Sequence, residues 1–159
     1  MWFMQYPAIA GESTRAGCEQ WIEVDSVSIS ANLSIPAGAT GAQRNNGTSS
    51  IGNLHVNMNM DRSFPDFMTH SMLGKSTQTV NLKLVATAGQ STVTTLLYEL
   101  ENVFVADVDA DVMDNTATAT VRLELDYSKI KITYSTFNPE TGDAQGQAPF
   151  TWDRHTAGA

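Results

Sequence analysis

The chain has 159 residues, 42% of them hydrophobic, and a formal net charge of -8 from 9 Lys and Arg against 17 Asp and Glu. This length suits one domain, expected over residues 1–159, that buries roughly two-thirds of its unfolded surface. The acidic balance leaves no basic surface for a phosphate backbone or an anionic lipid, which argues against nucleic-acid and membrane-surface roles. No apolar stretch reaches the roughly 20 residues of a spanning helix, so no membrane anchor is expected.

The first residues of the chain and its single cysteine indicate the cellular compartment in which the protein is expected to fold. Met1 to Ile9 holds neither a basic n-region nor a long apolar core, which predicts a cytosolic protein without a secretory signal. The single cysteine, Cys18, excludes an internal disulfide and suits a reducing environment. It lies in the polar run Ser13 to Gln20 with no histidine near it, so we interpret it as a loop thiol rather than a nucleophile.

Two strands are expected before residue 31. Residues 2–6 alternate in polarity, which predicts a first strand ended by Pro7. Between Glu19 and Ile29 the alternation returns and then slips by one residue, as in a strand with a β-bulge. One face of this second strand carries three small hydroxyl side chains: Ser26, Ser28 and Ser30.

The region from Pro36 to Gly52 is the least regular in the chain. Gly, Ala, Asn, Ser and Thr dominate it and apolar periodicity disappears, so it cannot build core and should project from the body. Its composition fits a surface loop and an intermolecular arm equally well. Asn46-Gly47-Thr48 fits the glycosylation pattern, but without a secretory signal we interpret it as a turn.

Asn53 to Asp61 gives the cleanest alternation and predicts a strand with an amide-rich outer face. A short α-helix is expected from Pro65 to Leu73, because proline favours the first helical position and Gly74 follows the end. Its apolar residues are expected to pack on the core: Phe64, Phe67, Met68 and Met72. His70 on this helix has no histidine at ligand spacing, so no metal site is expected.

A hairpin follows, with a connection at Ala88 to Ser91 and a second strand that changes phase before Val103. Asp107 to Asp114 resembles the start of a calcium loop. Val112 replaces the required glycine and Thr118 replaces the closing glutamate, so we interpret these acids as capping a turn instead.

The longest alternating stretch runs from Thr120 to Tyr134, and its apolar set slips by one residue beyond Ser128. We expect one long strand with a β-bulge near Ser128 and Lys129 that keeps both apolar sets on one core. The Gly- and Gln-rich tail then leads to a short final strand at Phe150 to Asp153, with Arg154 to Ala159 loose.

Catalytic motifs are missing from the sequence. It contains no nucleophile elbow, no glycine-rich phosphate loop, no CxxC and no HExxH. Glu99 and Glu101 share a strand face and could serve as acid and base in a hydrolase, but a solvated sheet face explains them better. The protein is expected not to be an enzyme and to need no cofactor or metal.

The order and spacing of several segments resemble one family. These segments are Gly11-Glu12-Ser13, Trp21-Ile-Glu-Val24, the irregular excursion, the helix ending in Gly74-Lys75, Tyr98 to Val103, Leu123 to Tyr134, and Phe150-Thr-Trp-Asp153. Together they resemble Hcp, the haemolysin co-regulated tube protein of bacterial type VI secretion. The excursion departs from the family by being less glycine-dense. Phe64 stands where a Ser or Thr cap is usual in the family.

The resemblance implies an all-β protein: a two-sheet β-barrel with one short flanking α-helix, about Pro65 to Leu73, and a long extended loop, about Pro36 to Gly52. It implies a structural subunit that forms homo-hexameric rings stacked into a hollow tube. The implied partners are a contracting sheath, a spike protein at the tube tip and secreted effectors in the lumen. The protein would leave the cytoplasm through the type VI apparatus toward a target cell, without a signal peptide.

The resemblance also implies roles for two groups of residues. The excursion is expected to contact an adjacent ring, with four candidate stacking residues: Gln43, Arg44, Asn45 and Asn46. We further hypothesise that part of the lumen wall, where cargo binds, is formed by Ser26, Ser28 and Ser30.

Three alternatives remain open at this point. A tail-tube subunit of a phage or another contractile injection particle would use the same architecture. A small β-barrel that binds a ligand on its own and a carboxylate-dependent hydrolase are the other two.

Overall fold

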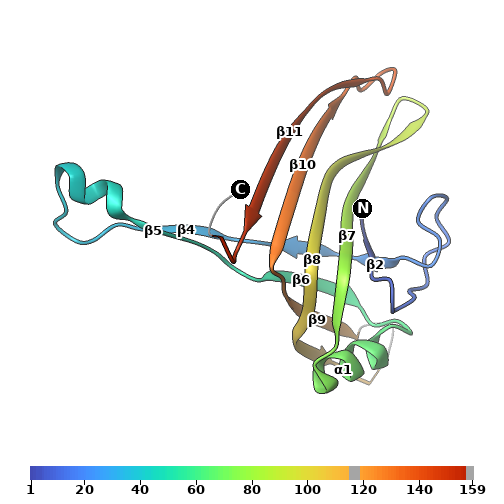
Figure 1. Cartoon of the computed structure of the whole chain (residues 1–159). Helices are drawn as coiled ribbons and strands as arrows, with labels where there is room; N and C mark the ends of the chain where they lie inside the picture. Colours follow the sequence, from blue (N-terminus) through green and yellow to red (C-terminus); the bar gives the residue numbers. More distant parts are fainter. Residues whose placement is uncertain (115–118, 157–159) are drawn as a thin grey trace.

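The computed structural model describes residues 1–114 and 119–156 of the chain (Figure 1). Strands dominate these described ranges, and one α-helix lies at one end of the strands. The elements are β1 (Trp2–Gln5), β2 (Ile22–Val24), β3 (Ser26–Ser28), β4 (Ala31–Ser34), the 3-10 helix η1 (Gly41–Asn46), β5 (Thr48–Ile51), β6 (Leu54–Asn59), α1 (Phe64–Leu73), β7 (Ser76–Ala88), β8 (Ser91–Asp111), β9 (Thr120–Asp126), β10 (Lys129–Phe137) and β11 (Ala144–Asp153).

One antiparallel sheet carries most of the fold. Its strands follow the order β2-β1-β7-β8-β9-β6-β3, and β10 joins it by pairing with both β8 and β11. The two ends of this order, β2 and β3, are consecutive in the chain, and Asp25 between them donates its N–H to the Asn57 carbonyl of β6 at 2.8 Å. The sheet therefore curls and brings the β2 end close to β6 without pairing β2 with β3 in the described residues, and the dominance of strands confirms the all-β class. The second sheet is the two-stranded pair β4-β5.

The core lies inside this curl because the inward faces of the strands are apolar. In β6 the alternation is complete, with Leu54, Val56 and Met58 fully buried and the residues between them exposed. A small second cluster lies outside the curl, where Phe3, Val85 and Cys18 are buried together. Cys18 is thus in a loop, as expected, but its thiol is packed away from solvent.

The helix begins one residue earlier than expected and packs through one narrow side. Phe67 and His70 are buried, and the Tyr6 ring meets the Phe67 ring edge-on at 5.3 Å between centroids. Met68 and Met72 are exposed, so the prediction that they join the core is wrong. At 100° per residue they lie well round the helix from Phe67.

The helix ends are close to the predicted ones. Gly74 caps the C-terminus in the left-handed conformation, with φ 62°. At the other end Ser63 takes the N-cap position. The Ser63 hydroxyl donates to the Asp61 carboxylate rather than to the helix backbone. A serine therefore does precede the helix, one position before Phe64.

Three neighbouring strands change their buried face along one line. Buried residues along a strand normally lie two positions apart, but at this line they lie three apart. The pairs are Thr77 and Val80 in β7, Leu100 and Val103 in β8, and Tyr127 and Ile130 across the β9–β10 junction. The residues between them include Gln78, Asn102 and Ser128, which we call the crease. Asn102 has a φ of 53°, in the left-handed region that asparagine tolerates better than most residues.

The crease corrects the expectation for residues 120–134. The apolar phase does change at Ser128, but the chain forms two strands there, β9 and β10, instead of one bulged strand. The pairing register with β8 is the same on both sides, since Asp126 pairs with Phe104 and Lys129 with Glu101. When adjacent strands switch their buried side at the same place, the pairing register is kept and no strand needs the extra residue of a β-bulge. Beyond the crease Tyr134 is 53% exposed, so that part of the second apolar set does not reach the core.

Two other strands differ in extent from the sequence prediction. The second strand is interrupted at Asp25, which separates β2 from β3. The last strand begins at Ala144 rather than Phe150 and pairs with β10 along its length. Its Gly, Gln and Pro content suits an edge strand, because Pro149 can sit where no N–H is needed for pairing.

Candidate assembly surfaces

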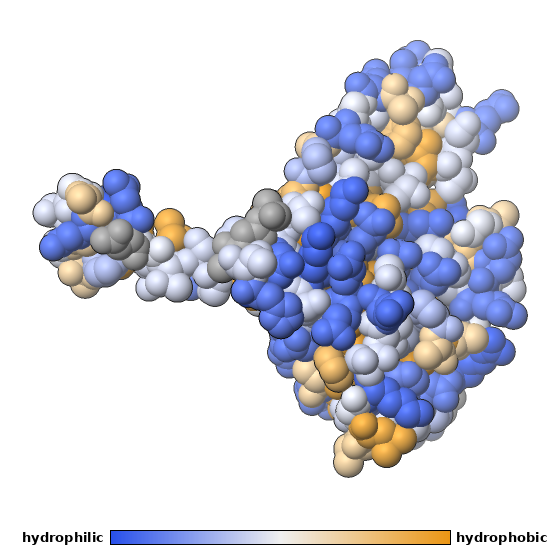
Figure 2. All heavy atoms as spheres, viewed as in Figure 1, coloured by the Kyte–Doolittle hydropathy of each residue, from blue (hydrophilic) through white to orange (hydrophobic). Residues whose placement is uncertain are grey.

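A β-hairpin projects from the body and forms the most distinctive surface of the molecule. We call residues 31–51 the arm: β4 leads outward, η1 forms the tip and β5 returns. Within the part of the chain that the structure describes, β4 and β5 pair only with each other, from Ala31 with Ile51 to Ser34 with Thr48. Figures 1 and 2 show the arm standing clear of the curled sheet, so its predicted projection is confirmed.

The arm is more regular than its composition suggests. We expected no periodic structure from Pro36 onward, but Thr48–Ile51 is a strand paired with residues before Pro36. The pairing satisfies backbone groups on one side of each strand and requires no buried side-chain face, so polarity alternation does not reveal it. All four β4 side chains are exposed, and Leu33 is 56% accessible.

The candidate stacking residues lie together at the arm tip. Gln43, Arg44 and Asn45 belong to η1 and are exposed, and Asn46 ends this helix. Arg44 is the only charged residue between positions 31 and 51, whereas the whole chain has a net charge of -8. The tip therefore carries one positive charge, and the rest of the arm is uncharged.

An apolar groove lies where the arm joins the body. It encloses about 300 Å³ between the two arm strands and the end of β11, and its lining includes Leu33, Ile51, Phe150 and Trp152. Phe150 is 44% exposed, and among the described residues no charged side chain lines the groove. Surface of this kind is stabilised by contact with another apolar surface.

The arm root is held by residues that the sequence prediction missed. The Arg154 guanidinium donates to the Ile51 carbonyl and to the Asn53 side-chain oxygen, both at 2.9 Å. The Tyr127 hydroxyl donates to the Gly52 carbonyl at 2.7 Å. The expectation that the chain is loose from Arg154 onward is therefore wrong for Arg154 itself. No local pattern marks it, because its partners are about 100 residues away in the sequence.

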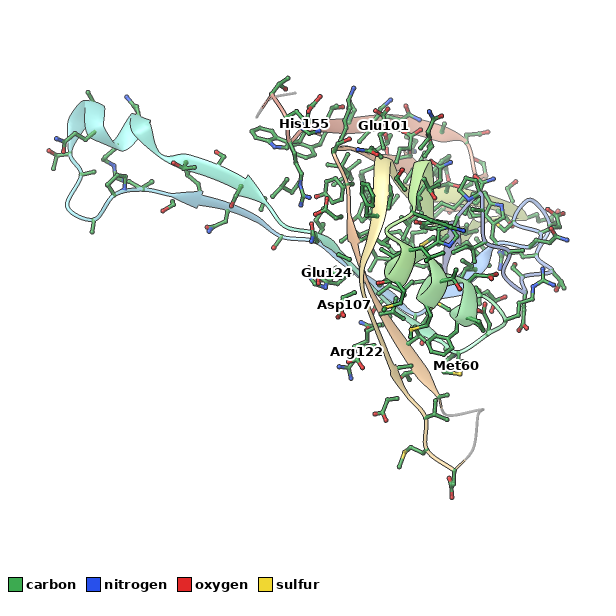
Figure 3. All side chains as sticks on the ribbon, turned by 60° about the horizontal axis from the view of Figure 1, so that its bottom comes forward. Met60, Glu101, Asp107, Arg122, Glu124 and His155 are labelled. Carbon is green, nitrogen blue, oxygen red and sulfur yellow. The ribbon has the colours of Figure 1, made fainter. Side chains whose placement is uncertain are left out.

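The three candidate cargo serines lie at the edge of a broad polar face. Ser26 and Ser28 are exposed on β3, and Ser30 is exposed just before the arm. Backbone pairing places them in rows across β3, β6, β9 and β8: Ser26, Asn57, Arg122 and Asp109 in one row, and Ser28, His55, Glu124 and Asp107 in the next. We call these eight residues the polar face. Figure 3 shows Asp107, Arg122 and Glu124 directed away from the body on the same side.

The polar face is only loosely tied together. The Asn57 amide donates to the Ser26 hydroxyl at 2.9 Å, and the Arg122 guanidinium lies 3.9 Å from the Asp109 carboxylate. Both members of this ion pair are about two-thirds exposed, so the pair adds little to folding. The face offers hydroxyl, amide and charged groups to solvent or to a neighbouring molecule.

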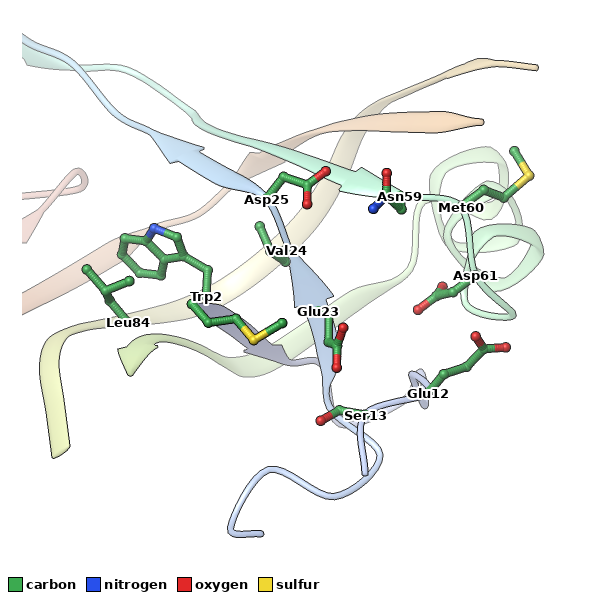
Figure 4. Close-up of a pocket in the computed structure, with 11 residues that line it drawn as sticks. Trp2, Glu12, Ser13, Glu23, Val24, Asp25, Asn59, Met60, Asp61 and Leu84 are labelled. Carbon is green, nitrogen blue, oxygen red and sulfur yellow. The ribbon is translucent and has the colours of Figure 1, made fainter. Parts of the chain in front are cut away.

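A second hollow, beside β1 and β2, is acidic. It has a volume of about 700 Å³, and its lining includes four carboxylates, from Glu12, Glu23, Asp25 and Asp61 (Figure 4). Among the described residues no group of three or more His, Cys, Asp or Glu side chains is placed to hold a metal ion. Across the same ranges no helix is long and apolar enough to cross a membrane.

Glu99 and Glu101, the two candidate acid and base residues, lie on the outer face of β8. They are opposite Lys131 and Lys129 of β10 in the pairing register. An open hollow of about 430 Å³ lies over these four side chains. Their position on a solvated sheet face agrees with the interpretation that the sequence favours.

A curled antiparallel sheet with an exposed, projecting arm is typical of one class of protein, structural subunits that assemble with others. Comparison with protein families gives the particular family. Residues 3–134 match the family model described as "Type VI secretion system effector, Hcp", so the chain belongs to the Hcp family. It is a type VI secretion tube subunit. Among curated proteins no sequence matches the chain.

Solved structures agree in fold. A type six secretion system protein is similar with a TM-score of 0.86 at 21% identity, covering 98% of this chain and 96% of that one. Hcp1 from Salmonella typhimurium gives 0.77 at 20% identity, covering 99% and 96%. A type VI secretion system effector from Yersinia pestis gives 0.74 at 16% identity, covering 96% and 99%. The fold is thus preserved over nearly the whole chain at low identity.

Proposed function

We propose that this chain forms closed homo-hexameric rings and that the arm joins each ring to the next in a hollow tube. The protein acts as a structural subunit and not as an enzyme. Membership of the Hcp family supports this over a phage tail tube or a barrel that works alone. The arm is the observation that carries the proposal.

An isolated two-stranded hairpin is marginally stable in water. The arm is such a hairpin, with outer edges that pair with no other strand in the described part of the chain and with exposed apolar side chains at Leu33 and Ile35. Exposed edges and apolar groups favour contact with another chain. A neighbouring subunit that covers the arm would stabilise it and bury the groove at its root.

Charge supports the same role for the tip. Each ring carries a large negative charge, because each subunit contributes a net charge of -8. Rings of like charge repel each other, and a positive group between them reduces that repulsion. Arg44 at the arm tip is placed to supply such a group in every subunit.

The test is to shorten the arm without touching the body. In the variant, a two-residue Asn-Gly turn replaces residues 35–47 and joins β4 directly to β5, a connection that favours hairpins. We expect unchanged unfolding, closed rings, and loss of stacked tubes in electron micrographs. Tubes of normal length in this variant would rule out a stacking role for the arm.

A smaller change tests the tip charge. Arg44→Glu should shorten tubes and make their length increase with added salt, because screening weakens the new repulsion. Gln43→Glu also makes the same tip more negative but keeps Arg44, so it serves as the control. Equal tube lengths for the two variants would assign no special role to Arg44.

For cargo, we propose that Ser26, Ser28 and Ser30 form part of the lumen wall. All three serines are exposed, and Ser26 and Ser28 belong to the polar face, which supports this because hydroxyl and amide groups can bind many protein surfaces through hydrogen bonds. Ser28→Trp should reduce the amount of effector that purifies with the rings and leave the rings intact. The control is Thr79→Trp, at an exposed residue of β7 that pairs with Glu101 and is not part of the polar face. Retention of effector by Ser28→Trp would contradict the assignment.

The remaining partners follow from the same proposal. The tube would contact a spike protein at its tip, a sheath around it and effectors within it. Subunits would assemble in the bacterial cytoplasm and leave through the type VI apparatus. Co-purification of the sheath and spike proteins with the tube from a secreting strain checks this directly.

A further inference from the structure

The arm joins the body through two neighbouring segments of the chain, and the Gly52 N–H in one donates to the Ser30 carbonyl in the other at 2.8 Å. The root is the segment Ile51 to Asn53, between the end of β5 and the start of β6. Beyond the root, the arm strands pair only with each other within the described ranges. The direction of the arm therefore depends in part on how these three residues are held, and the Asn53 amide also donates to the Glu124 carboxylate at 3.0 Å.

Two side chains from distant parts of the chain hold the root. Arg154 follows β11, and one of its terminal nitrogens binds both the Ile51 carbonyl and the Asn53 side-chain oxygen at 2.9 Å. Tyr127 lies at the crease between β9 and β10, and its hydroxyl binds the Gly52 carbonyl at 2.7 Å. All three root residues are thus held by these two side chains.

The two side chains are themselves fixed. The Arg154 guanidinium lies over the Tyr127 ring, 4.1 Å from its centroid, and its other terminal nitrogen donates to the Tyr127 carbonyl at 3.1 Å. The Arg154 N–H donates to the Ser128 carbonyl at 2.8 Å, which ties its backbone to the crease. Tyr127 is 1% exposed. The Arg154 guanidinium and the Tyr127 hydroxyl, which bind the root, are therefore both held in place by the body.

We propose that Arg154 is a positioning residue for the arm: with Tyr127 it sets the direction in which the arm leaves the body, and so the place on a neighbouring subunit that the arm reaches. The inference about the neighbour rests on the proposed function of the arm. The direction of the arm is a property of the single subunit. Arginine suits this role, because its planar fork binds several acceptors in fixed directions and lysine cannot reproduce that geometry.

The direction of the arm can be measured with two spin labels. In a Cys18→Ala background, Gln43→Cys labels the arm tip and Thr69→Cys labels helix α1, where both side chains are exposed. Dilution with unlabelled protein leaves one labelled subunit in each ring. Pulsed electron spin resonance then reports the distance between tip and body.

We expect a single narrow distance distribution with Arg154 present, and loss of that peak to a broad distribution in Arg154→Gln. Arg154→Lys should behave like Arg154→Gln, since the fork and not the charge is needed. The control is Arg122→Gln on β9, an exposed arginine that does not contact the arm. It should keep the narrow peak.

A narrow, unshifted peak in Arg154→Gln would overturn the proposal. If that variant fails to fold, Tyr127→Phe is measured in its place. This change removes only the hydroxyl that binds Gly52, and an unchanged peak would overturn the proposal equally. Tube formation is scored separately on the same samples. A broadened distribution with normal tubes would confirm positioning and contradict the stacking function of the arm.

Discussion

The body and the arm of this subunit are stabilised in opposite ways. The body buries a continuous apolar core inside a curled sheet, from Met4 in β1 to Ile130 in β10. The arm buries almost nothing of its own, and its hairpin pairs only with itself within the described residues. The difference shows where folding ends and assembly begins. The body is stabilised by its own core, whereas the β4 side chains of the arm are all exposed, which is why we propose that a neighbouring subunit covers it.

The largest expected effect is a core deletion next to the crease. Leu100 is fully buried on β8, so Leu100→Ala should cost about 2–5 kcal/mol of unfolding free energy in a urea titration, through lost transfer energy and a cavity. Leu33→Ala makes the same chemical change in the arm, where the side chain is 56% exposed, and should change the free energy by less than about 0.5 kcal/mol. Similar losses in both variants would contradict the division between body and arm.

A backbone change at the crease should have the next largest effect. Asn102 has a φ of 53°, a conformation that a β-branched residue adopts with difficulty. Asn102→Val should therefore destabilise the body by about 1–3 kcal/mol in the same titration. Asn102→Gly relieves the strain and serves as the control. If valine were as stable as glycine, Asn102 would not be needed for the change of face.

Alkaline pH tests the buried tyrosines. Burial raises the pKa of Tyr127 above its ordinary value of 10.0, and the nearby Arg154 charge opposes this only in part. Because the folded pKa is raised, the stabilisation from Tyr127 is complete below about pH 10 and is lost as the pH rises through the folded pKa.

Unfolding free energies measured from about pH 8 to about pH 12 should therefore fall only above about pH 10. Burial also raises the pKa of Tyr6 and Tyr98, so Tyr127→Phe should weaken the alkaline loss and not abolish it. A loss that began near neutral pH would contradict this assignment.

The smallest effect is expected on the polar face. Arg122 and Asp109 form an exposed ion pair 3.9 Å apart, so Arg122→Gln should change the unfolding free energy by no more than about 1 kcal/mol. A double-mutant cycle with Asp109→Asn measures the coupling between the two charges. Strong coupling would mean that this face contributes to folding as well as to contacts with other molecules.

Local periodicity predicted the elements in which one face is buried in the core and the other is exposed to solvent. The alternation in β6, the helix ending at Gly74 and the β7–β8 hairpin all follow from residues within one segment. The position of the crease was also readable, because the apolar phase changes at Ser128. Its mechanism was not, since a change of face shared by adjacent strands is indistinguishable from a bulge in any one of them.

The surfaces were harder to predict, for a physical reason. The arm strands pair through backbone groups that carry no sequence signal, and composition could show only that the arm projects. Arg154 contacts residues about 100 positions away, and such a contact depends on the completed sheet. The structure places Gln43, Arg44 and Asn45 on the exposed helix η1 at the arm tip, and their role in stacking stays a prediction.

The most direct test of the account is native mass spectrometry of the purified protein over a range of concentrations. The account predicts closed six-subunit rings for the unchanged chain, and the same rings when the arm is shortened, because the arm acts between rings. A protein that stays monomeric at high concentration would contradict the assignment of this chain as a tube subunit.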